Sequence, residues 1–505
     1  MKYLDKIIDS VTMYRLVLYY LIALLIIAGL FGFFKILPYS PIAIAVSCIV
    51  LISVSWATNK LFSSVFRVPV NVESVYITAL ILALIITPMK TMEDSILLAW
   101  AAVLANASKY IFAIYKKHIF NPAALAVVLT AFCLGQSASW WVGNTWMSIF
   151  VLVGGILLVR KINREDLVIS FFVAALISVS VFMVLKGGNV ITTYEGSFFH
   201  SSLLFLGFVM LTEPLTTPPT RPLRIIYGAL VGLLFSPKIN VYGIYSTPEL
   251  ALLTGNIFSY LVSSKQKLVL AVQQKIQIAP DLVDFLFIHD KKFHYIPGQY
   301  MEWTLPPEYA DDRGNRRYFT LASSPTEDSL RLGVKFCSPG SSYKEIMAAM
   351  DATTPIIASQ LSGDFTLPRN KQKKLVFIAG GIGITPFRSM MKSLVDTNER
   401  RDIVLFYSNR HVDEVVYTEV FDAAVTNLGI RTVYTLTDTT AIPPDWQFGV
   451  GRIDETMIAQ EVPDYLERFF YLSGSHDMVT AYEATLRKMG VKRRQIKKDY
   501  FPGYA

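Results

Sequence analysis

Cysteine and histidine are scarce in this sequence. The 505 residues include three cysteines, Cys48, Cys133 and Cys337, and six histidines, of which only His118 and His200 precede residue 264. Three thiolates cannot ligate a four-cysteine iron–sulfur cluster, and they do not form a disulfide framework. A membrane haem needs paired histidines on two helices, whereas both candidates lie at the ends of apolar runs. We therefore expect neither an iron–sulfur cluster nor a haem in this chain.

Charged residues are also few, at 17% of the chain against 53% apolar residues, and they are unevenly placed. Residues 1–263 contain long apolar runs, whereas residues 264–505 have the composition of a soluble protein. This contrast predicts a membrane half joined to a soluble half. The formal net charge of +8 does not indicate a nucleic-acid partner, because the basic residues gather at the ends of apolar segments.

Ten segments of the membrane half are candidate spans, since a helix needs about 20 apolar residues to cross a bilayer. They lie near residues 12–34, 39–57, 72–88, 95–114, 121–136, 144–160, 166–185, 199–213, 223–236 and 248–263. Most basic residues lie at alternate ends of these segments, namely Lys2, Lys6, Lys60, Arg67, Lys116, Lys117, Arg160, Lys161, Arg164, Arg221, Arg224, Lys265 and Lys267. Positive charge marks the cytoplasmic side, so ten spans predict a cell-membrane protein with both termini and the soluble half in the cytoplasm.

Several polar residues lie where a plain membrane anchor would not need them: Asn121, Thr212, Glu213 and Asn256. An acid or an amide at membrane depth is costly and usually faces a cavity or a cofactor. We therefore predict that these side chains line a cofactor pocket. The alternative is that they cap helices, as Pro122 at a first helical turn would also suggest.

These residues stand in three blocks that resemble one membrane family. The blocks read SKYIFAIYKKHIFNPAALAVVL, GFVMLTEPLTTPPTRPLRIIYGALVGLLF and STPELALLTGNIFSYL. They are similar to a flavin-holding membrane component of the sodium-pumping NADH:quinone oxidoreductase and to the corresponding membrane component of the Rnf complex, over about residues 70–263. The resemblance implies two pseudo-repeats of five helices and a flavin held within the membrane.

The chain departs from this family at one point. The family attaches FMN through a phosphoester to a threonine in a Ser-Gly-Ala-Thr-like motif, and residues 192–202 contain no such motif. We therefore expect FMN or riboflavin to be bound non-covalently. The remaining candidates in that region are Thr192, Thr193, Ser197, Ser201 and Ser202.

The soluble half is organised around residues 375–389, LVFIAGGIGITPFRS. An apolar strand, a glycine turn and the start of an amphipathic helix make a place for a pyrophosphate. Glycines let the backbone approach the ligand, and a helix N-terminus presents unpaired N–H groups and a positive dipole end. The residues expected to meet it are Gly380, Gly381, Gly383, Thr385 and Pro386. The alternative is a tight turn before a helix.

Short strands broken by turns precede this stretch, over residues 268–368, and predict a β-barrel. This region contains RYFTLASSP from Arg317 and PGSSY from Pro339. Each motif alone is compatible with a hairpin turn. Together with the glycine turn they resemble the ferredoxin–NADP reductase family over nearly all of residues 268–505. The resemblance implies an FAD site formed by Arg317, Phe319, Thr320, Ser323, Gly340, Ser341 and Ser342.

Residues 371–505 alternate strands and helices, which predicts an α/β nucleotide-binding domain. Ser408 and Arg410 follow its second strand, where Arg410 either binds a 2′-phosphate or is simply solvated. By resemblance, Ser473 replaces the cysteine that lies near the nicotinamide in the family, and Phe501 covers the flavin unless it belongs to a packed tail. Thr320, Ser473 and Phe501 are the residues expected nearest to hydride transfer.

The sequence therefore predicts a transmembrane, NAD(P)H-dependent flavin oxidoreductase with three domains, 1–263, 268–368 and 371–505. Electrons would pass from cytoplasmic NADH or NADPH through FAD to FMN or riboflavin in the membrane half. The acceptor would be a quinone or an extracytoplasmic compound, and a homo-oligomer is possible. The alternative is a redox-driven Na⁺ or H⁺ pump, or a flavin-type transporter with a tethered reductase.

Overall fold

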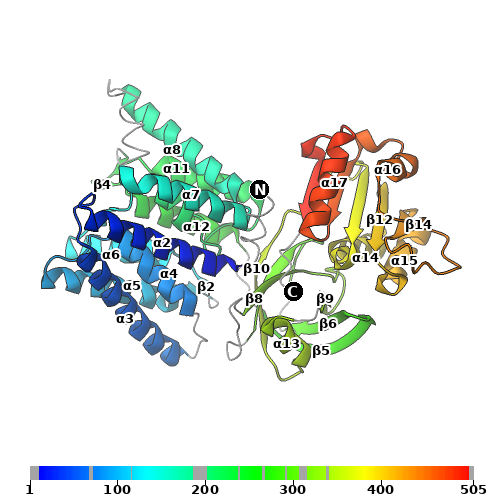
Figure 1. Ribbon diagram of the computed structural model, residues 1–505, viewed down its shortest axis with the longest axis horizontal. Helices are drawn as coiled ribbons and strands as arrows, with labels where there is room; N and C mark the ends of the chain where they lie inside the picture. Colours follow the sequence, from blue (N-terminus) through cyan, green and yellow to red (C-terminus); the bar gives the residue numbers. More distant parts are fainter. Residues whose placement is uncertain are drawn as a thin grey trace. The chain divides into compact units, whose positions relative to one another are not determined.

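The computed structural model describes residues 11–66, 72–114, 117–185, 202–236, 239–263, 268–289, 293–305, 315–336 and 340–499. The chain divides into two compact units, Met1–Lys265 and Gln266–Ala505. Each unit is described by itself (Figure 1). The predicted domain boundaries, 1–263, 268–368 and 371–505, remain predictions.

The first unit is a bundle of helices that lie side by side (Figure 1). Within the described residues they are α2 Met13–Phe33, α3 Pro41–Phe66, α4 Val72–Ile85, α5 Met92–Ile111, α6 Pro122–Leu134, α7 Thr145–Ile162, α8 Glu165–Leu185, α10 Leu203–Phe205, α11 Arg221–Leu234 and α12 Pro248–Val262. These helices are apolar on more than one side: α2 buries Leu21 and Leu24 but leaves Ile26 59% exposed. A helix that is apolar all round is typical of a membrane.

Four of the described helices are long and apolar enough to cross a membrane: α2, α3, α7 and the Glu165–Phe182 part of α8. The apolar helices α4 and α6 are shorter. The segment expected at residues 199–213 differs from a regular span, because α10 continues as the π-helix η1 Leu206–Met210. Gly207 lies against the rings of Phe171 and Phe172 there, so this turn is tightly packed.

The bundle contains the same helix–hairpin–helix arrangement twice. β1 Ala113–Ile114 and β2 Lys117–His118 form a hairpin between α5 and α6, and β3 Asn240–Val241 and β4 Ile244–Tyr245 form one between α11 and α12. Both α6 and α12 then begin with a proline after a side-chain cap. Helix α2 contacts α4 as α7 contacts η1, and α3 contacts α5 as α8 contacts α11. The two parts of the bundle thus resemble one another, and their division into two five-helix repeats stays a prediction.

The second unit begins with a six-stranded antiparallel sheet. Its strands are β5 Leu268–Ala279, β6 Leu282–His289, β7 Tyr300–Thr304, β8 Arg316–Thr320, β9 Leu330–Lys335 and β10 Ile356–Ser362, in the order β8-β7-β10-β5-β6-β9. Alternate residues of β9 are buried, as expected for a sheet with one face on a core. The Ala322 N–H donates to the Arg331 carbonyl at 2.9 Å and so joins the chain after β8 to β9. Helix α13, Ser342–Ala349, packs on this core.

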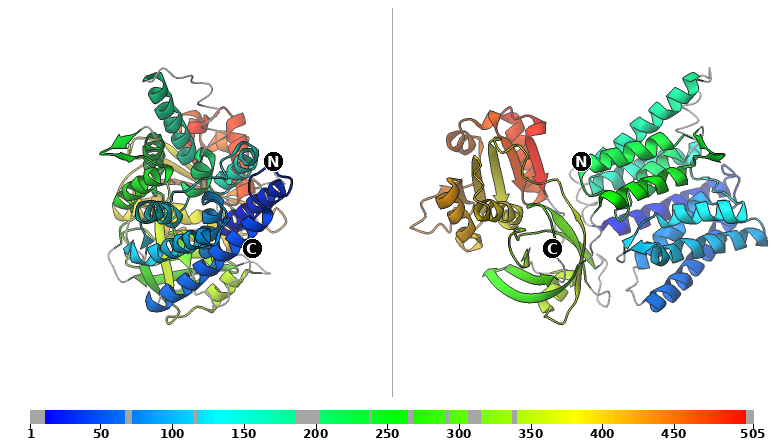
Figure 2. Two further views of the ribbon diagram at one scale, coloured as in Figure 1. Left: turned by 90° about the vertical axis from the view of Figure 1, so that its left-hand side faces the viewer. Right: turned by 180° about the vertical axis from the view of Figure 1, so that it is seen from behind.

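A six-stranded parallel sheet follows (Figure 2). Its strands are β11 Leu375–Gly380, β12 Ile403–Asn409, β13 Arg431–Leu436, β14 Gly449–Val450, β15 Phe469–Ser473 and β16 Ile496–Asp499, in the order β14-β13-β12-β11-β15-β16. Helices α14 Thr385–Asp396 and α15 Thr418–Leu428 cover one face, and α16 Glu455–Glu461 and α17 His476–Lys488 cover the other. Strand order reverses between β11 and β15, and ligands bind at such a switch point.

Candidate cofactor sites

The glycine turn lies at the carboxyl end of β11, beside the switch point. Gly381 has a φ of 51°, and a Cβ atom added to it would have no atom within 4 Å. The backbone at Gly381 is therefore open to a ligand. Thr385 begins α14 and its hydroxyl donates to the Ile382 carbonyl at 3.2 Å, which fastens the turn. Pro386 lies in the first helical turn, where its missing N–H costs nothing.

Gly383 meets the end of β15. A Cβ atom on Gly383 would lie 2.5 Å from the Ser473 carbonyl oxygen and 2.6 Å from the Gly474 nitrogen. A Cβ atom on Gly380 would lie 2.0 Å from the sulfur of Met478. The structure thus brings the predicted residues Gly380, Gly383 and Ser473 together, in an arrangement that only glycine allows.

The second strand end adds Ser408 and Arg410. Ser408 is paired in register with Gly380 and is buried. The Arg410 side chain is mostly exposed, and its Nε lies 4.0 Å from a carboxylate oxygen of Asp438. The His411 ring also approaches Asp438, at 3.7 Å. This geometry leaves both readings of Arg410, phosphate binding and solvation, as predictions.

The predicted FAD residues of β8 come together with α13. Arg317 is buried, and its guanidinium lies 4.9 Å from the centre of the Tyr343 ring. The Phe319 ring lies 6.1 Å from the same ring. Tyr343 is itself fixed, because its hydroxyl donates to the Trp303 carbonyl at 3.1 Å. Arg317 is therefore held as a planar donor beside the helix that carries Ser341 and Ser342.

The start of α13 supplies the rest of a phosphate site. Ser341 is the N-cap and accepts from the Lys344 N–H at 3.4 Å, Gly340 precedes it, and Ser342 is the first helical residue. The first turn of a helix has N–H groups without helical partners and the positive dipole end. Together with the cation of Arg317, this donor set fits a pyrophosphate.

Ser323 lies in the segment after β8. Its hydroxyl oxygen accepts from the Tyr295 hydroxyl at 2.9 Å and from the Arg331 N–H at 3.1 Å. Ser323 is fully buried, and its hydrogen bonds hold the segment after β8 in place. Its predicted contact with the flavin stays a prediction.

Asp499 is a site residue that the sequence reasoning missed. The Thr320 hydroxyl donates to Asp499 Oδ2 at 3.4 Å, and Asp499 is paired in register with Ser473. Burial raises the pKa of the Asp499 carboxyl to about 7. The segment IKKDY contains no motif, although its position just before the C-terminal aromatic residues was a usable signal. Phe501 lies outside the described residues.

In the membrane unit, three of the four predicted polar residues meet in one hydrogen-bond network. Asn121 donates from Nδ2 to Glu213 at 2.9 Å and from its backbone N–H to Asn256 Oδ1 at 2.8 Å. His118 Nε2 lies 3.2 Å from the other oxygen of Glu213, and Asn256 Nδ2 donates to the Tyr227 hydroxyl at 3.0 Å. The network joins the start of α6 to the segment after η1 and to helices α11 and α12.

Much of this network is occupied by protein partners. Asn121 is the N-cap of α6 and accepts from the Ala124 N–H at 3.0 Å, so the capping alternative applies to it. Thr212 is outside the network, because its hydroxyl donates to the Phe208 carbonyl at 2.9 Å. A role for these residues as the lining of a flavin pocket stays a prediction.

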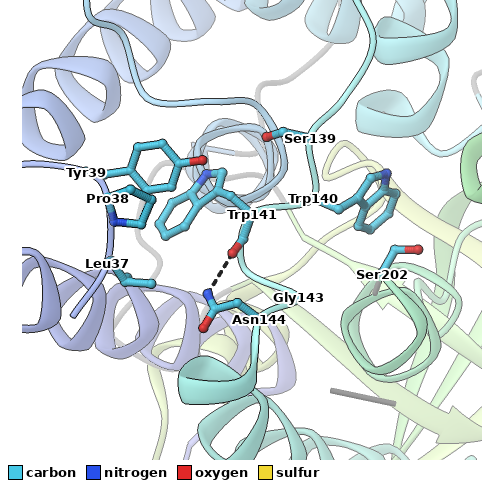
Figure 3. Close-up of a pocket in the computed structure, with 9 residues that line it drawn as sticks. All are labelled: Leu37, Pro38, Tyr39, Ser139, Trp140, Trp141, Gly143, Asn144 and Ser202. Atoms are coloured by element: carbon cyan, nitrogen blue, oxygen red, sulfur yellow. Dashed lines mark hydrogen bonds between the residues drawn. The ribbon is translucent and has the colours of Figure 1, made fainter. Parts of the chain in front are cut away.

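An aromatic cavity of about 420 Å³ lies elsewhere in the membrane unit (Figure 3). Its lining is Leu37, Pro38, Tyr39, Ser139, Trp140, Trp141, Gly143, Asn144 and Ser202. Trp141 points toward Tyr39 on one side of the 139–144 loop, and Trp140 points toward Ser202 on the other (Figure 3). Sequence reasoning missed this aromatic cluster, although it had singled out Ser202; Thr192, Thr193, Ser197 and Ser201 lie outside the described residues.

The tryptophans of this cavity are fixed through their indole N–H groups. Trp140 donates to a carboxylate oxygen of Glu249 at 2.6 Å, and Trp141 donates to the Ala83 and Ile86 carbonyls at 2.9 and 3.0 Å. The latter bonds, with others from this loop, satisfy the last carbonyls of α4. Trp140 has a φ of 49°, a left-handed conformation that is unusual for a bulky residue. Such strain clusters at functional sites.

Two protein families match separate parts of the chain. Residues 141–268 match the NQR2, RnfD, RnfE family, and residues 377–484 match the oxidoreductase NAD-binding domain. Both resemblances seen in the sequence are thereby confirmed. Part of the N-terminal half is thus similar to this membrane family, and part of the C-terminal half is similar to the NAD-binding domain of oxidoreductases.

Two curated relatives each match less than half of the chain. A flavohemoprotein of Oceanobacillus iheyensis is 26% identical over 215 residues, which is 41% of this chain and 51% of that protein. An NADPH oxidoreductase of Mycobacterium tuberculosis is 28% identical over 207 residues, which is 40% of this chain and 51% of that protein. The chain spans about half the length of these curated relatives.

Solved structures give weak overall similarity. The Amycolatopsis cytochrome P450 reductase GcoB has a TM-score of 0.41 at 22% identity, over 47% of this chain and 70% of that one. A ferredoxin NADP⁺ reductase from Neisseria gonorrhoeae, with bound FAD and NADP, has a TM-score of 0.39 at 20% identity, over 46% of this chain and 97% of that one.

Proposed function

We propose that this chain is a membrane-embedded NAD(P)H-dependent flavin oxidoreductase. Electrons pass from cytoplasmic NAD(P)H through FAD to a second flavin in the membrane unit, and then to a quinone or an extracytoplasmic acceptor. The observation that carries the proposal is the union, in one chain, of a glycine turn at a sheet switch point with a segment of the NQR2, RnfD, RnfE family. When bound, FAD accepts a hydride and gives up electrons one at a time, which no side chain can do.

In the soluble unit, the side chains bind and orient the cofactors. Arg317 and the start of α13 would hold the FAD pyrophosphate, and Phe319 would lie against its ring system. Thr320 donates a hydrogen bond, and Asp499 holds or releases a proton at Oδ2, beside the Thr320 hydroxyl. The glycine turn and the start of α14 hold the NAD(P)H pyrophosphate at the switch point.

In the membrane unit, the aromatic cavity is the better fit for the ring of a second flavin. Its nine described lining residues include aromatic rings, hydroxyls and an amide but no charged side chain, which suits an uncharged ring more than a phosphate. The Asn121–Glu213–Asn256 network has fewer polar atoms left for a ligand. We therefore propose non-covalent FMN or riboflavin with its ring at the aromatic cavity.

The position of this cavity agrees with a path across the membrane. Its lining comes from the connection between the first and second proposed spans, from that between the fifth and sixth, and from the start of the eighth. With ten crossings and a cytoplasmic N-terminus, all three segments lie on the extracytoplasmic side. A ring held there is well placed to pass electrons outward.

One further candidate function has structural support. The repeated helix–hairpin–helix arrangement is of the kind that recurs in transporters, where binding sites lie at the repeat interface. A redox-driven Na⁺ or H⁺ pump, or a flavin-type transporter with a tethered reductase, would use the same architecture.

Two measurements test the proposed function. Acid extraction of the purified full chain should release one FAD and at least one FMN or riboflavin per chain; FAD alone would contradict the membrane relay. In proteoliposomes with the soluble unit outside, added NADH should reduce an acceptor trapped inside. Ion uptake without reduction of the trapped acceptor would support the transporter instead.

A further inference from the structure

Arg388 is a buried cation at the seam between the antiparallel and the parallel sheet of the second unit. It lies on α14, one turn after the glycine turn, and it is 3% exposed. Its guanidinium lies 5.4 Å from the centre of the Tyr417 ring. A buried arginine must be paired, because an isolated charge at such a position is strongly unfavourable.

Both partners of Arg388 belong to the segment that follows β8. Nη1 and Nη2 donate to the two carboxylate oxygens of Glu327 at 2.6 and 2.9 Å, which is a bidentate fork. Nη1 also donates to the Ala322 carbonyl at 2.8 Å. Glu327 is tied back to the same segment, because it accepts from the Ser324 N–H at 2.6 Å. Bidentate pairs of this kind fix geometry as well as energy.

Neighbouring bonds strengthen the same seam. The Ser389 hydroxyl donates to the Ser323 carbonyl at 2.5 Å. The Tyr417 hydroxyl donates to the buried Asp284 at 2.5 Å, and Asp284 pairs with Arg331 at 2.7 Å. Burial opposes ionisation of Glu327, but the hydrogen bonds and charge of Arg388, the Ser324 N–H and the charge of Arg331 together outweigh burial and keep the Glu327 pKa below its ordinary value. The seam is therefore charged and joined by several hydrogen bonds, although Arg388 Nε itself has no hydrogen-bond partner among the described residues.

The seam connects the two candidate cofactor segments. Ala322 follows Thr320, at the end of the FAD strand, by two residues, and Arg388 follows Thr385, at the start of α14, by three. We propose that Arg388 is a positioning residue: its clamp on Glu327 and Ala322 sets how closely the nicotinamide of NAD(P)H approaches the flavin. This inference rests on the proposed function of the soluble unit.

The expected effect is large because hydride transfer depends steeply on distance. A misplacement of about 1 Å can cost about a hundredfold in rate. A lysine at position 388 keeps the charge but has no fork, so it cannot hold both oxygens of Glu327 and the Ala322 carbonyl. Glu327→Gln keeps the shape of the side chain but removes the negative charge that accepts the hydrogen bonds of Arg388.

The test uses the full chain with Arg388→Lys and, as a second variant in case the first folds poorly, Glu327→Gln. Arg468→Lys is the matched control. Arg468 is equally a buried bidentate arginine, with bonds of 2.7 and 3.2 Å to Asp402 and 2.6 Å to Asp464, but it lies at the opposite, amino-terminal end of the parallel sheet. NAD(P)H oxidation is followed with ferricyanide, so that the membrane unit is not required.

Both seam variants should keep their FAD and lose about tenfold to a hundredfold in kcat, with KM for NAD(P)H changed less than about threefold. The long-wavelength absorption of a nicotinamide stacked on a flavin should weaken in both. Arg468→Lys should keep kcat within about twofold. Equal losses in kcat for Arg388→Lys and Arg468→Lys, or a loss explained by release of FAD, would overturn the proposal.

Hydrogen–deuterium exchange without nucleotide separates the clamp from the proposed function. Exchange at residues 320–327, which include the Ser324 amide bonded to Glu327, should rise in Arg388→Lys and stay unchanged in Arg468→Lys. Unchanged exchange in Arg388→Lys would overturn the clamp even in an active enzyme. A wild-type chain that does not oxidise NAD(P)H would instead refute the proposed function, whatever the exchange result.

Discussion

Gly383→Ala should separate nucleotide binding from FAD binding. The new methyl group would lie 2.5 Å from the Ser473 carbonyl oxygen and 2.6 Å from the Gly474 nitrogen, whereas ordinary contact begins at 3.4 Å. Both neighbours are backbone atoms, so they cannot rotate away, and the glycine turn and the end of β15 must separate by roughly 0.9 Å. Overpacking of this kind costs about 1–3 kcal/mol.

This strain falls on the switch point where the NAD(P)H pyrophosphate is expected. If binding requires the original approach, a cost of about 1–3 kcal/mol weakens NAD(P)H binding by roughly 5- to 150-fold. FAD content should not change, because Arg317 and Tyr343 lie on the other sheet and its helix. Isothermal titration with the reaction product, NAD⁺ or NADP⁺, measures the affinity without turnover, and flavin extraction measures the FAD.

Gly429→Ala is the matched control for this prediction. Gly429 caps α15 with a φ of 73°, and a Cβ atom there would have no atom within 4 Å. Its substitution should lower the free energy of unfolding by about 1 kcal/mol and leave nucleotide affinity unchanged. If Gly383→Ala binds nucleotide as tightly as the wild type, the close approach of Gly383 to the end of β15 is not needed for nucleotide binding.

Other substitutions test the remaining parts of both units. Arg317→Ala should lose FAD and all NAD(P)H oxidation, as measured by flavin absorbance and a ferricyanide assay; retained FAD would disprove the assignment. The Asp499 carboxyl, with its pKa raised to about 7 by burial, should contribute stability below about pH 4 that is lost as pH rises through 7. Asp499→Asn should flatten this dependence in thermal unfolding scans and remove any inflection near pH 7 in the rate of NAD(P)H oxidation; an unchanged inflection would argue against Asp499. Asn256→Leu removes the acceptor for the Asn121 N–H and the donor to the Tyr227 hydroxyl. We expect it to lower the free energy of unfolding by about 1–3 kcal/mol, which thermal unfolding in detergent would show as a lower melting temperature. Trp140→Leu should lower the FMN or riboflavin content without changing the FAD content. An unchanged ratio of the two flavins would show that the second flavin does not bind at the aromatic cavity.

Local patterns were sufficient to predict the elements around the glycine turn. The strand of residues 375–380 is buried on both faces, and a strand of this kind has a continuous apolar sequence. The glycines that follow it indicate a turn in which the backbone comes close to a ligand or to another strand. Asn121, Glu213 and Asn256 could be singled out in the same way, because an acid or an amide at membrane depth is costly and usually faces a cavity or a cofactor. In each case the physical reason is contained within a short stretch of chain.

The missed features depend on contacts between distant parts of the chain. Thr320 and Asp499 are 179 residues apart, and Glu327 and Arg388 are 61 apart. No periodicity or spacing brings such pairs together before the two sheets are assembled. The hydrogen bonds of Ser323 could not be predicted for the same reason, since its partners are Tyr295 and Arg331.

The fork between Arg388 and Glu327 also limits how this protein can change over generations. Loss of either partner alone leaves an uncompensated charge in the interior, at a cost of about 3–5 kcal/mol, which is a large part of the stability of a typical domain. Descendants that keep a folded reductase must therefore exchange both residues nearly together, for example for two apolar side chains. Among relatives, a change at the arginine position without a change at the glutamate position should be rare.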